Sequence, residues 1–366
     1  MLTIDGAYGE GGGQIVRTSL ALACLTGQDV TLVNVRAGRK NPGLAPQHLA
    51  AVRAIAQVCG AQVTGDALGS TRLVFRPGGP ATPGDYEWDV SAIAGQGSAG
   101  SVSLVLQTVL LPLLRAPGRS RLVIRGGTHV PAAPPVHYLR EVFLPALGAA
   151  GEAVTVELRA WGWYPQGGGE ITVEVEGPAA HLLWSCDPPG RSTQANRALV
   201  RDVRGPLERV TGVAAVTNLP AHIPQRMADR ARGVLRDLGV PLEIEPLRAR
   251  GPGPGAGIFL TAHYAGGRAG FSALGRKGRA SEAVAEEACT DLLAHHHSRA
   301  AADPHLADQL ILPCALAGGR SVFTTSRVTP HLATNIHVVR QFLGTAITLE
   351  GEAEGRVELV GGGLDV

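Results

Sequence analysis

The stretch that decides the fold is residues 30–38, VTLVNVRAG, an apolar strand pattern that ends in an arginine and a glycine. A second stretch, residues 121–127, reads RLVIRGG and ends in a similar way. The two arginines, Arg36 and Arg125, are 89 residues apart, as are the glycines two positions later. A fixed spacing between similar segments indicates an internal repeat.

The segments around each stretch predict the same order of elements, β-α-β-α-β-β. In the first copy we expect strands at 2–5, 30–35, 61–64 and 72–76, and helices ending near 25 and spanning 46–59. In the second we expect strands at 86–90, 121–124, 154–158 and 170–176, and helices at 101–114 and 136–149. A shorter third copy has helices at 306–316 and 332–342 and strands at 321–325, 346–350 and 356–360. These patterns predict an α/β fold of the α+β type, with three units around a common axis.

Residues 181–280 do not fit the repeat and differ from it in charge. They contain 15 lysines and arginines against 7 acidic residues, a net charge of +8, whereas the whole chain has a net charge of +2. We therefore expect a core domain in two parts, residues 1–180 and 281–366, with a smaller basic domain inserted between them. Residues 281–297 are expected to begin the second part as a helix.

The amino-acid composition indicates which kind of protein this is. The chain has 366 residues, of which 45% are hydrophobic and 17% charged, which argues for a packed globular protein and against disorder. Five scattered cysteines without a Cys-x-x-Cys pair indicate reduced thiols and a cytoplasmic location. The first ten residues lack the basic segment of a secretion signal, and the longest apolar stretch, 101–114, is too short to span a membrane. No membrane partner is expected, and the oligomeric state is left open.

A glycine-rich turn, residues 9–14 (GEGGGQ), lies between an expected strand and an expected helix. Backbone N–H groups at such a turn can approach an anion closely because glycine has no side chain. Glu10 within the turn could hold a divalent cation that bridges to phosphate. A plain tight turn explains the same residues, and the pattern alone does not decide between them.

Residues 95–100, GQGSAG, match the dinucleotide pattern G-x-G-x-x-G. A nicotinamide site also needs an acidic residue about 20 positions later, but the next carboxylate after Asp89 is Glu141. We therefore do not expect such a site. A P-loop is excluded because no G-x-x-x-x-G-K-[ST] surrounds either lysine. Gln107 is a polar residue in an apolar helix, either a core amide or a ligand contact.

Histidine is the better candidate for a covalent nucleotide carrier, because neither of the two lysines lies in a Lys-x-Asp-Gly setting. His331 follows Pro330 and directly precedes an expected helix, whose N-terminus would favour an anionic phosphate. A capping histidine is the alternative. His295, His296 and His297 are consecutive and therefore point to different sides of a helix, which is poor geometry for a metal.

Other polar residues lie where ligand contacts are commonly built. Asp308 and Gln309 enter an apolar helix, where they either cap it or contact a base and ribose. Four arginines lie just past glycine-rich turns or strand ends, where bidentate phosphate contacts or solvated surface would each explain them: Arg17, Arg36, Arg39 and Arg125.

Five motifs in this order resemble those of the RNA 3′-terminal phosphate cyclase family, and the match covers nearly the whole chain. They are EGGGQIVR at 10–17, RAGR at 36–39 with PGL at 42–44, WGWYPQGGG at 161–169, LADQL at 306–310 and HLATNI at 331–336. The resemblance implies that the protein converts an RNA 3′-phosphate to a 2′,3′-cyclic phosphate with ATP and a divalent metal, Mg²⁺ or Mn²⁺. It implies that His331 attacks the α-phosphorus of ATP and carries AMP, which then activates the RNA phosphate for attack by the 2′-OH.

The resemblance also assigns roles to individual residues. It places the metal at Glu10, and the phosphate and RNA end at Arg17, Arg36, Arg39 and Gln47. It places the adenylate at Gln107, His305, Leu306, Ala307, Asp308 and Gln309. The family often has a tyrosine where His305 stands, and an imidazole can still stack on adenine. The family fold has three repeated units and a thioredoxin-like insert.

Two other functions fit parts of the sequence. A catalytically inactive cyclase-like factor that binds RNA in ribosome assembly would resemble the chain but lack the nucleophile, which His331 supplies. A small-molecule transferase related by fold to enolpyruvyl transferases rests on fold analogy alone. The basic insert would help to hold the body of the RNA through phosphate contacts, although a solvated surface explains its charge equally well.

Overall fold

The structure is a computed structural model that describes residues 1–93, 99–148, 152–177 and 199–362. Three of its sheets have four strands each and share one pattern: the first pair of strands is parallel and the other two pairs are antiparallel. The first sheet contains, in spatial order, β1 (Leu2–Asp5), β2 (Val30–Val33), β4 (Leu73–Arg76) and β3 (Gln62–Thr64). The second contains β5 (Asp85–Asp89), β6 (Arg119–Gly126), β8 (Gly169–Glu176) and β7 (Val154–Ala160). The α/β class expected from the sequence is therefore confirmed.

The third sheet is assembled from distant parts of the chain. It contains β9 (Val200–Arg201), β14 (Gly318–Thr325), β16 (Gly355–Gly362) and β15 (Ile347–Glu350). The short strand β9 pairs in parallel with β14, so it fills the place that β1 and β5 hold in the other two sheets. The charge count assigned these two residues to the insert, whereas their hydrogen-bonded partner belongs to the core.

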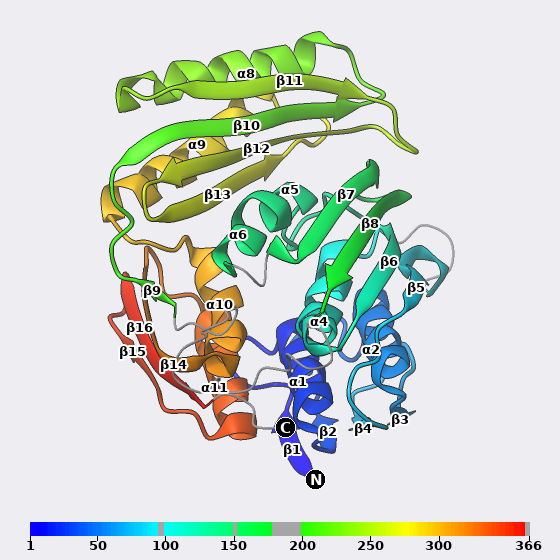
Figure 1. The fold of residues 1–366 in the computed structure, drawn as a ribbon. Coiled ribbons are helices and arrows are strands. Elements are labelled where there is room, and N and C mark those ends of the chain that lie inside the picture. Colours follow the sequence, from blue (N-terminus) through cyan, green and yellow to red (C-terminus); the bar gives the residue numbers. More distant parts are fainter. Residues whose placement is uncertain (94–98, 149–151, 178–198, 363–366) are drawn as a thin grey trace.

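Helices fill the space between the three sheets, as Figure 1 shows. They are α1 (Gly13–Thr26), α2 (Pro46–Cys59), α4 (Val102–Arg115), α10 (Pro304–Leu316) and α11 (Pro330–Leu343). Their apolar side chains and those of the sheets form one buried cluster that spans all three units, including Leu20, Leu106 and Val339. A continuous core brings residues from both ends of the chain to the same place, which positions the site described below.

The segment expected as one helix at 136–149 is interrupted. Residues 136–146 form α5 (Val136–Tyr138), a wider π-helical turn at Leu139–Phe143 and α6 (Leu144–Ala146), while Ala149 lies outside the described residues. Val90, expected at the end of a strand, instead begins the short helix α3 (Val90–Ile93). The carboxylate of Asp89 accepts hydrogen bonds from the backbone N–H of Ser91 and Ala92, which turns the chain away from the sheet.

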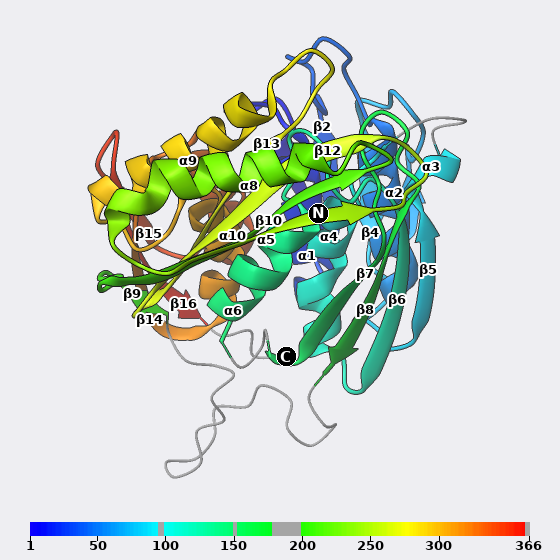
Figure 2. The ribbon, with the colours of Figure 1, turned by 90° about the horizontal axis from the view of Figure 1, so that it is seen from above.

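The fourth sheet forms a separate layer above the core (Figures 1 and 2). It contains β11 (Leu242–Ala249), β10 (Leu207–Thr217), β12 (Gly255–Tyr264) and β13 (Gly267–Leu274), with α8 (His222–Leu235) followed by a single 3₁₀ turn at Arg236–Leu238. The helix α9 (Ser281–Ser298) packs beside α8 on the same sheet. Val284, Ala288 and Leu292 of α9 share a buried cluster with Met227 of α8.

The position of α9 differs from its expected place in the second part of the core. The apolar residues of α9 indicate that one face of the helix is buried, but they do not show which sheet covers that face. Its acidic residues pair with the insert's arginines, Glu282 with Arg226 and Glu286 with Arg230. Part of the positive charge counted in residues 181–280 is therefore paired with a helix that lies beyond residue 280. Across the described parts of the chain, no helix has both the length and the apolar composition needed to cross a membrane.

Candidate active site

The glycine-rich turn that leads into α1 forms a tight cradle around Glu10 and His48. A Cβ atom added to Gly12 would lie 2.1 Å from Glu10 Oε1, and one added to Gly13 would lie 1.9 Å from His48 Nε2. A side chain at either position would force Glu10 or His48 to move, and the buried ring of His48, bonded to the Ala45 N–H, has little room to do so. No side chain caps the N-terminus of α1. Its first backbone N–H groups remain available to an anion, which favours the phosphate interpretation of this turn over a plain tight turn.

His331 lies in the first turn of α11. The helix begins at Pro330, one residue before His331, because Thr329 caps it: the Thr329 hydroxyl oxygen accepts from the Leu332 N–H over 3.0 Å. Proline at this position is favourable because its missing N–H would have no partner in the helix. The His331 side chain is 47% exposed, so it is open to a ligand while its backbone is held.

Three side chains from the two ends of the chain meet at one ring nitrogen. His331 Nδ1 donates to Gln14 Oε1 over 2.5 Å, and Glu10 Oε1 lies 2.9 Å from the same nitrogen. Both partners are oxygen acceptors, so the proton of the neutral imidazole belongs on Nδ1. The lone pair is then on Nε2, which is the atom free to act as a nucleophile.

The charges around this contact are mutually dependent. Burial alone would raise the pKa of Glu10, but the hydrogen bond and charge of His331, together with Arg39, outweigh it and hold the pKa below its usual value. The bond to Glu10 raises the pKa of His331, against the opposing effects of burial and Arg17. Arg39 Nη2 lies 3.3 Å from the other carboxylate oxygen of Glu10. Glu10 is thus an anion held between the Arg39 guanidinium and the imidazole of His331.

A cavity of about 970 Å³ opens beside His331. Residues of α1, α4 and α10 line it together with residues of β13 and α9. Six of the residues proposed from the sequence line this one cavity: Arg17, Gln107, His305, Asp308, Gln309 and His331. The amides of two of them are in direct contact, with Gln107 Nε2 donating to Gln309 Oε1 over 2.8 Å. The two polar residues that interrupt apolar helices therefore satisfy each other at the wall of the cavity.

Asp308 and Arg17 carry buried charge on this wall. Burial raises the pKa of Asp308 to about 7, while His331 and Arg17 oppose that rise. Burial lowers the pKa of Arg17 to about 10, with Asp308 and Glu10 opposing. Arg17 therefore remains a cation near neutral pH, whereas Asp308 lies close to its midpoint. A phosphate-bearing ligand would meet a fixed positive charge and a carboxyl group of adjustable charge.

Not every proposed residue reaches the cavity. Leu306 and Ala307 are fully buried in the apolar core and are not among the residues that line it. Gln47 is partly buried on α2 and does not line it either. Arg36 has a positive φ of 53° and donates from Nη1 to the Gly43 carbonyl over 2.7 Å, which orders the loop that carries Arg39. Residues 94–98 of the second glycine-rich turn lie outside the described residues.

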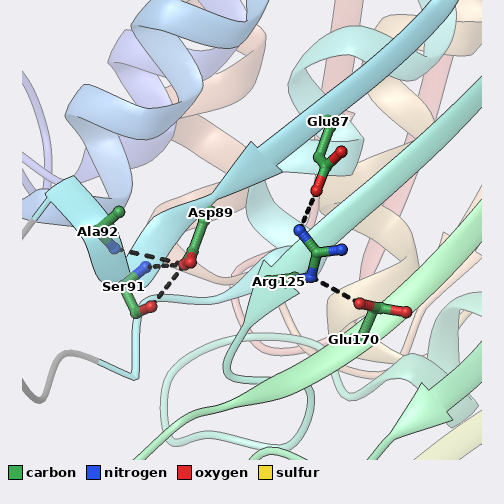
Figure 3. Close-up of polar contacts among 6 residues, drawn as sticks. All are labelled: Glu87, Asp89, Ser91, Ala92, Arg125 and Glu170. Atoms are coloured by element: carbon green, nitrogen blue, oxygen red, sulfur yellow. Dashed lines mark hydrogen bonds and ion pairs between the residues drawn. The ribbon is translucent and has the colours of Figure 1, made fainter.

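Arg125 pairs with carboxylates on two neighbouring strands. Its guanidinium contacts Glu87 on β5 and Glu170 on β8, the second through a 2.6 Å hydrogen bond from Nε (Figure 3). Arg125 therefore ties three strands together and is not placed for a phosphate contact. Arg36, which lies 89 positions earlier, instead donates to the Gly43 carbonyl in the loop that carries Arg39.

The residues present allow a divalent cation, although they do not form a complete protein cage. Among the described residues, no group of three or more His, Cys, Asp or Glu side chains is arranged to hold a metal. Glu10 Oε1 is nevertheless buried and accepts no further hydrogen bond within the described residues. Mg²⁺ commonly binds proteins through one or two carboxylates and completes its shell with water and substrate phosphates. A single carboxylate at this place fits that pattern.

Sequence analysis missed three residues that support the site. Gln14 holds His331, the Thr18 hydroxyl donates to Asn335 Oδ1 over 2.8 Å, and Asn335 Nδ2 donates to the Asp308 carbonyl over 2.7 Å. A signal for two of them was present in the helical period, because Gln14, Arg17 and Thr18 share one face of α1. Asn335 carried a weaker signal, as a polar residue four positions after His331.

Comparisons with known proteins agree with this geometry. A family model described as RNA 3′-terminal phosphate cyclase matches residues 8–349. A Methylococcus capsulatus protein named RNA 3′-terminal phosphate cyclase is 53% identical over 342 residues, which cover 93% of this chain and 91% of the relative. Proteins of the same name from Trichormus variabilis and Archaeoglobus fulgidus are 50% and 41% identical. The alignments cover 93% and 96% of this chain, and 94% and 98% of the relatives.

Proposed function

Because the chain belongs to the RNA 3′-terminal phosphate cyclase family, we propose that it converts an RNA 3′-phosphate to a 2′,3′-cyclic phosphate through AMP carried on His331. The observation that carries this proposal is the contact of His331 Nδ1 with Gln14 and Glu10. It leaves Nε2 as the nucleophilic nitrogen on a ring that lines a large cavity. Family membership implies the use of ATP and of RNA that ends in a 3′-phosphate.

In the first step, His331 Nε2 attacks the α-phosphorus of ATP. A nitrogen–phosphorus bond forms, the bond to the β-phosphate oxygen breaks, and pyrophosphate leaves. Glu10 and Gln14 keep the Nδ1 proton in place and stabilise the positive charge that the ring gains. Arg17, a buried cation on the cavity wall, would offset the negative charge of the phosphates.

In the later steps, an oxygen of the RNA 3′-phosphate takes AMP from His331, which forms a phosphoanhydride. The neighbouring 2′-OH then attacks the RNA phosphorus, AMP leaves with the bridging oxygen, and the cyclic phosphate closes. A phosphate monoester is a poor electrophile until its leaving oxygen becomes AMP, and the attacking hydroxyl is already on the same ribose. Arg39, beside Glu10 at the mouth of the turn, supports binding of the RNA phosphate at this end of the site.

The nucleotide would occupy the cavity between α4, α10 and the insert. The paired amides of Gln107 and Gln309 offer polar contacts, and the exposed imidazole of His305 offers a stacking surface. A bound Mg²⁺ or Mn²⁺ would supply charge neutralisation of the phosphates, and Glu10 is the residue that would hold it. The inactive RNA-binding alternative is disfavoured because the nucleophile, its two Nδ1 partners and the cavity are all present.

The same considerations support proposals about organisation and location. The shared pattern of the three core sheets supports structural repeats around a common axis. The packing of α9 supports an insert that begins after β9 and ends after α9, with one sheet and two helices that agree with a thioredoxin-like domain. Free, buried thiols at Cys24, Cys59, Cys289 and Cys314 support a cytoplasmic location; Cys186 lies outside the described residues.

Two measurements test the proposed function. The protein incubated with Mg²⁺ and ATP labelled at the α-phosphate should acquire label that is labile in acid and stable in alkali. His331→Ala should lose the label, whereas His297→Ala, at an exposed position on α9, should keep it. With an RNA that ends in a 3′-phosphate, the terminal phosphate should become resistant to phosphatase. Labelling of His331→Ala at the wild-type level would overturn the assignment.

A further inference from the structure

Tyr8 places an exposed aromatic ring beside the glycine-rich turn. Its side chain is 43% exposed, which is unusual for a large apolar side chain in this structure. The ring stacks on His337 of α11, with the ring centroids 3.5 Å apart and an angle of 8° between the planes. One face of the phenol ring is therefore covered, and the ring is held parallel to a second ring beneath it.

His337 is itself held in place from α11. Gln341 Nε2 lies 2.7 Å from His337 Nε2, so the amide donates to an unprotonated ring nitrogen. Burial and the charge of Arg340 lower the pKa of His337, with Asp5 opposing. The lower ring of the stack is thus a neutral imidazole with a fixed orientation, and Tyr8 rests on a rigid base.

Tyr8 belongs to the same turn as Glu10, and Arg39, which is assigned to the RNA phosphate, contacts this turn. The Tyr8 carbonyl accepts from the Gly11 N–H over 2.9 Å, which closes the turn around Glu10. Arg39 reaches the Gly11 carbonyl and the Glu10 carboxylate. The turn runs along α11: Tyr8 meets His337, Gly9 lies against Thr334, and Glu10 meets His331.

We propose that Tyr8, backed by His337, is a stacking platform for a base near the 3′ end of the RNA. The proposal rests on the proposed function, because it assigns to this chain a contact with the nucleotides that carry the reacting phosphate. Single-stranded RNA ends are commonly bound by stacking unpaired bases on aromatic side chains next to cationic groups. A ring already fixed by a stack and a hydrogen bond loses little further freedom when a base binds, which favours affinity.

The platform would bind RNA with little preference for sequence, because every base has a flat π surface. Arg39 would contact a backbone phosphate while the open face of Tyr8 holds a base. The RNA end would then be fixed at two points, the phosphate and a base, before AMP transfer. Orientation at two points would direct the phosphate toward His331.

The test compares three variants: Tyr8→Ala, Tyr8→Phe and the matched control Tyr164→Ala. Tyr164 is 68% exposed and lies in the turn between β7 and β8. Because base–aromatic stacking contributes substantially to single-strand binding, we expect Tyr8→Ala to raise KM for the RNA by roughly ten-fold. Tyr8→Phe, which keeps the ring, should stay within about two-fold of wild type by the same reasoning. Tyr164→Ala should behave as wild type.

A second arm uses RNAs that lack a base at one of the last three nucleotides but keep the 3′-phosphate. In the wild-type protein, one of these RNAs should lose about as much affinity as Tyr8→Ala loses for intact RNA. The same RNA should cost Tyr8→Ala little more, because the stacking partner is already absent. The proposal is overturned if Tyr8→Ala lowers the affinity, relative to wild type, by the same factor for intact RNA and for every RNA that lacks one of these bases.

The design separates this proposal from the proposed function. Labelling with ATP alone involves no RNA, so Tyr8→Ala should keep its label. If the label falls as much as the RNA affinity does, the substitution has disturbed the turn around Glu10, and the proposal that Tyr8 stacks on a base is overturned. If the wild-type protein neither labels nor cyclises, the proposed function fails. RNA binding measured by fluorescence anisotropy with the same RNAs still decides whether Tyr8 stacks on a base.

Discussion

Asn335 Nδ2 donates a 2.7 Å hydrogen bond to the backbone carbonyl of Asp308, and this bond joins the helix that carries His331 to the helix that lines the cavity. Asn335 Oδ1 accepts from the hydroxyl of Thr18, so the same amide also reaches α1. The side chain is buried, and both bonds are shielded from water. One amide thus holds together the helix that carries His331, the helix that carries Gln14 and a helix that lines the cavity.

Asn335→Ala should lower the free energy of unfolding by roughly 1–3 kcal/mol, because it leaves two buried polar groups without partners. Urea denaturation followed by circular dichroism measures this change. Thr18→Val serves as the control, because it removes only one of the two bonds and should cost less. A fully stable Asn335→Ala protein would show that the bond does not hold the helices together.

Gln14→Leu should slow formation of the labelled protein with ATP by about ten-fold, because one acceptor for the His331 Nδ1 proton is lost. Rapid quenching of the reaction with labelled ATP measures the rate. Gln28→Leu is the matched control, since Gln28 makes only a 3.4 Å bond to the Phe342 carbonyl. Equal rates for wild type and Gln14→Leu would mean that Glu10 alone orients the ring.

Buried neutral histidines predict a loss of stability in mild acid. His129 Nε2 and His137 Nδ1 are 2.9 Å apart between the core and the insert, and burial lowers the pKa of His137 to about 3. Below about pH 6.5, the His137 imidazole binds a proton in the unfolded chain but stays neutral in the folded protein. The free energy of unfolding therefore decreases as the pH falls below about 6.5. At pH 5 this costs roughly 2 kcal/mol for His137 alone.

The corresponding measurement is the free energy of unfolding at pH 7.5 and pH 5 for wild type, His137→Gln and His297→Gln. His137→Gln should show a smaller difference between the two pH values, since the titrating group is gone. His297 is exposed, so its replacement should leave the difference unchanged. The explanation is wrong if His137→Gln retains the whole wild-type pH dependence.

Arg276 and Lys277 should contribute to RNA binding through phosphate contacts. They lie in the insert between β13 and α9, and Arg276 lines the cavity. Replacing both with Gln should weaken RNA binding and reduce the slope of log affinity against log salt by about one for each lost contact. Arg226→Gln is the control, because Arg226 is paired with Glu282 on α9. An unchanged slope in the double variant would remove these two residues from the RNA interface.

Deletion of residues 181–280 would be a less specific test of RNA binding than this double variant. That deletion would strip α9 of its sheet and expose the apolar side chains of Val284 and Leu292. Any loss of RNA binding would then reflect damage to the fold as well as loss of charge.

Local patterns in the sequence determined most helices and strands and the place of His331 at the start of a helix. The sequence predicted α2 at its observed bounds, and the position after Pro330 placed His331 at the start of a helix. The polar residues in apolar helices, Gln107, Asp308 and Gln309, line one cavity, and their role as ligand contacts stays a prediction. These features depend on backbone sterics, capping and amphipathic period, which act over a few residues and are therefore visible in the sequence.

Tertiary structure decided which of these residues meet. Gln14 and His331 are 317 positions apart, and their contact depends on the shared core of α1 and α11. Arg36 and Arg125 follow similar apolar stretches, yet Arg125 has two carboxylate partners on neighbouring strands, whereas Arg36 donates to the Gly43 carbonyl. The apolar stripe of α9 could not reveal which sheet would bury it. Burial and ion pairing depend on side chains brought together by packing, and no local pattern specifies the partner.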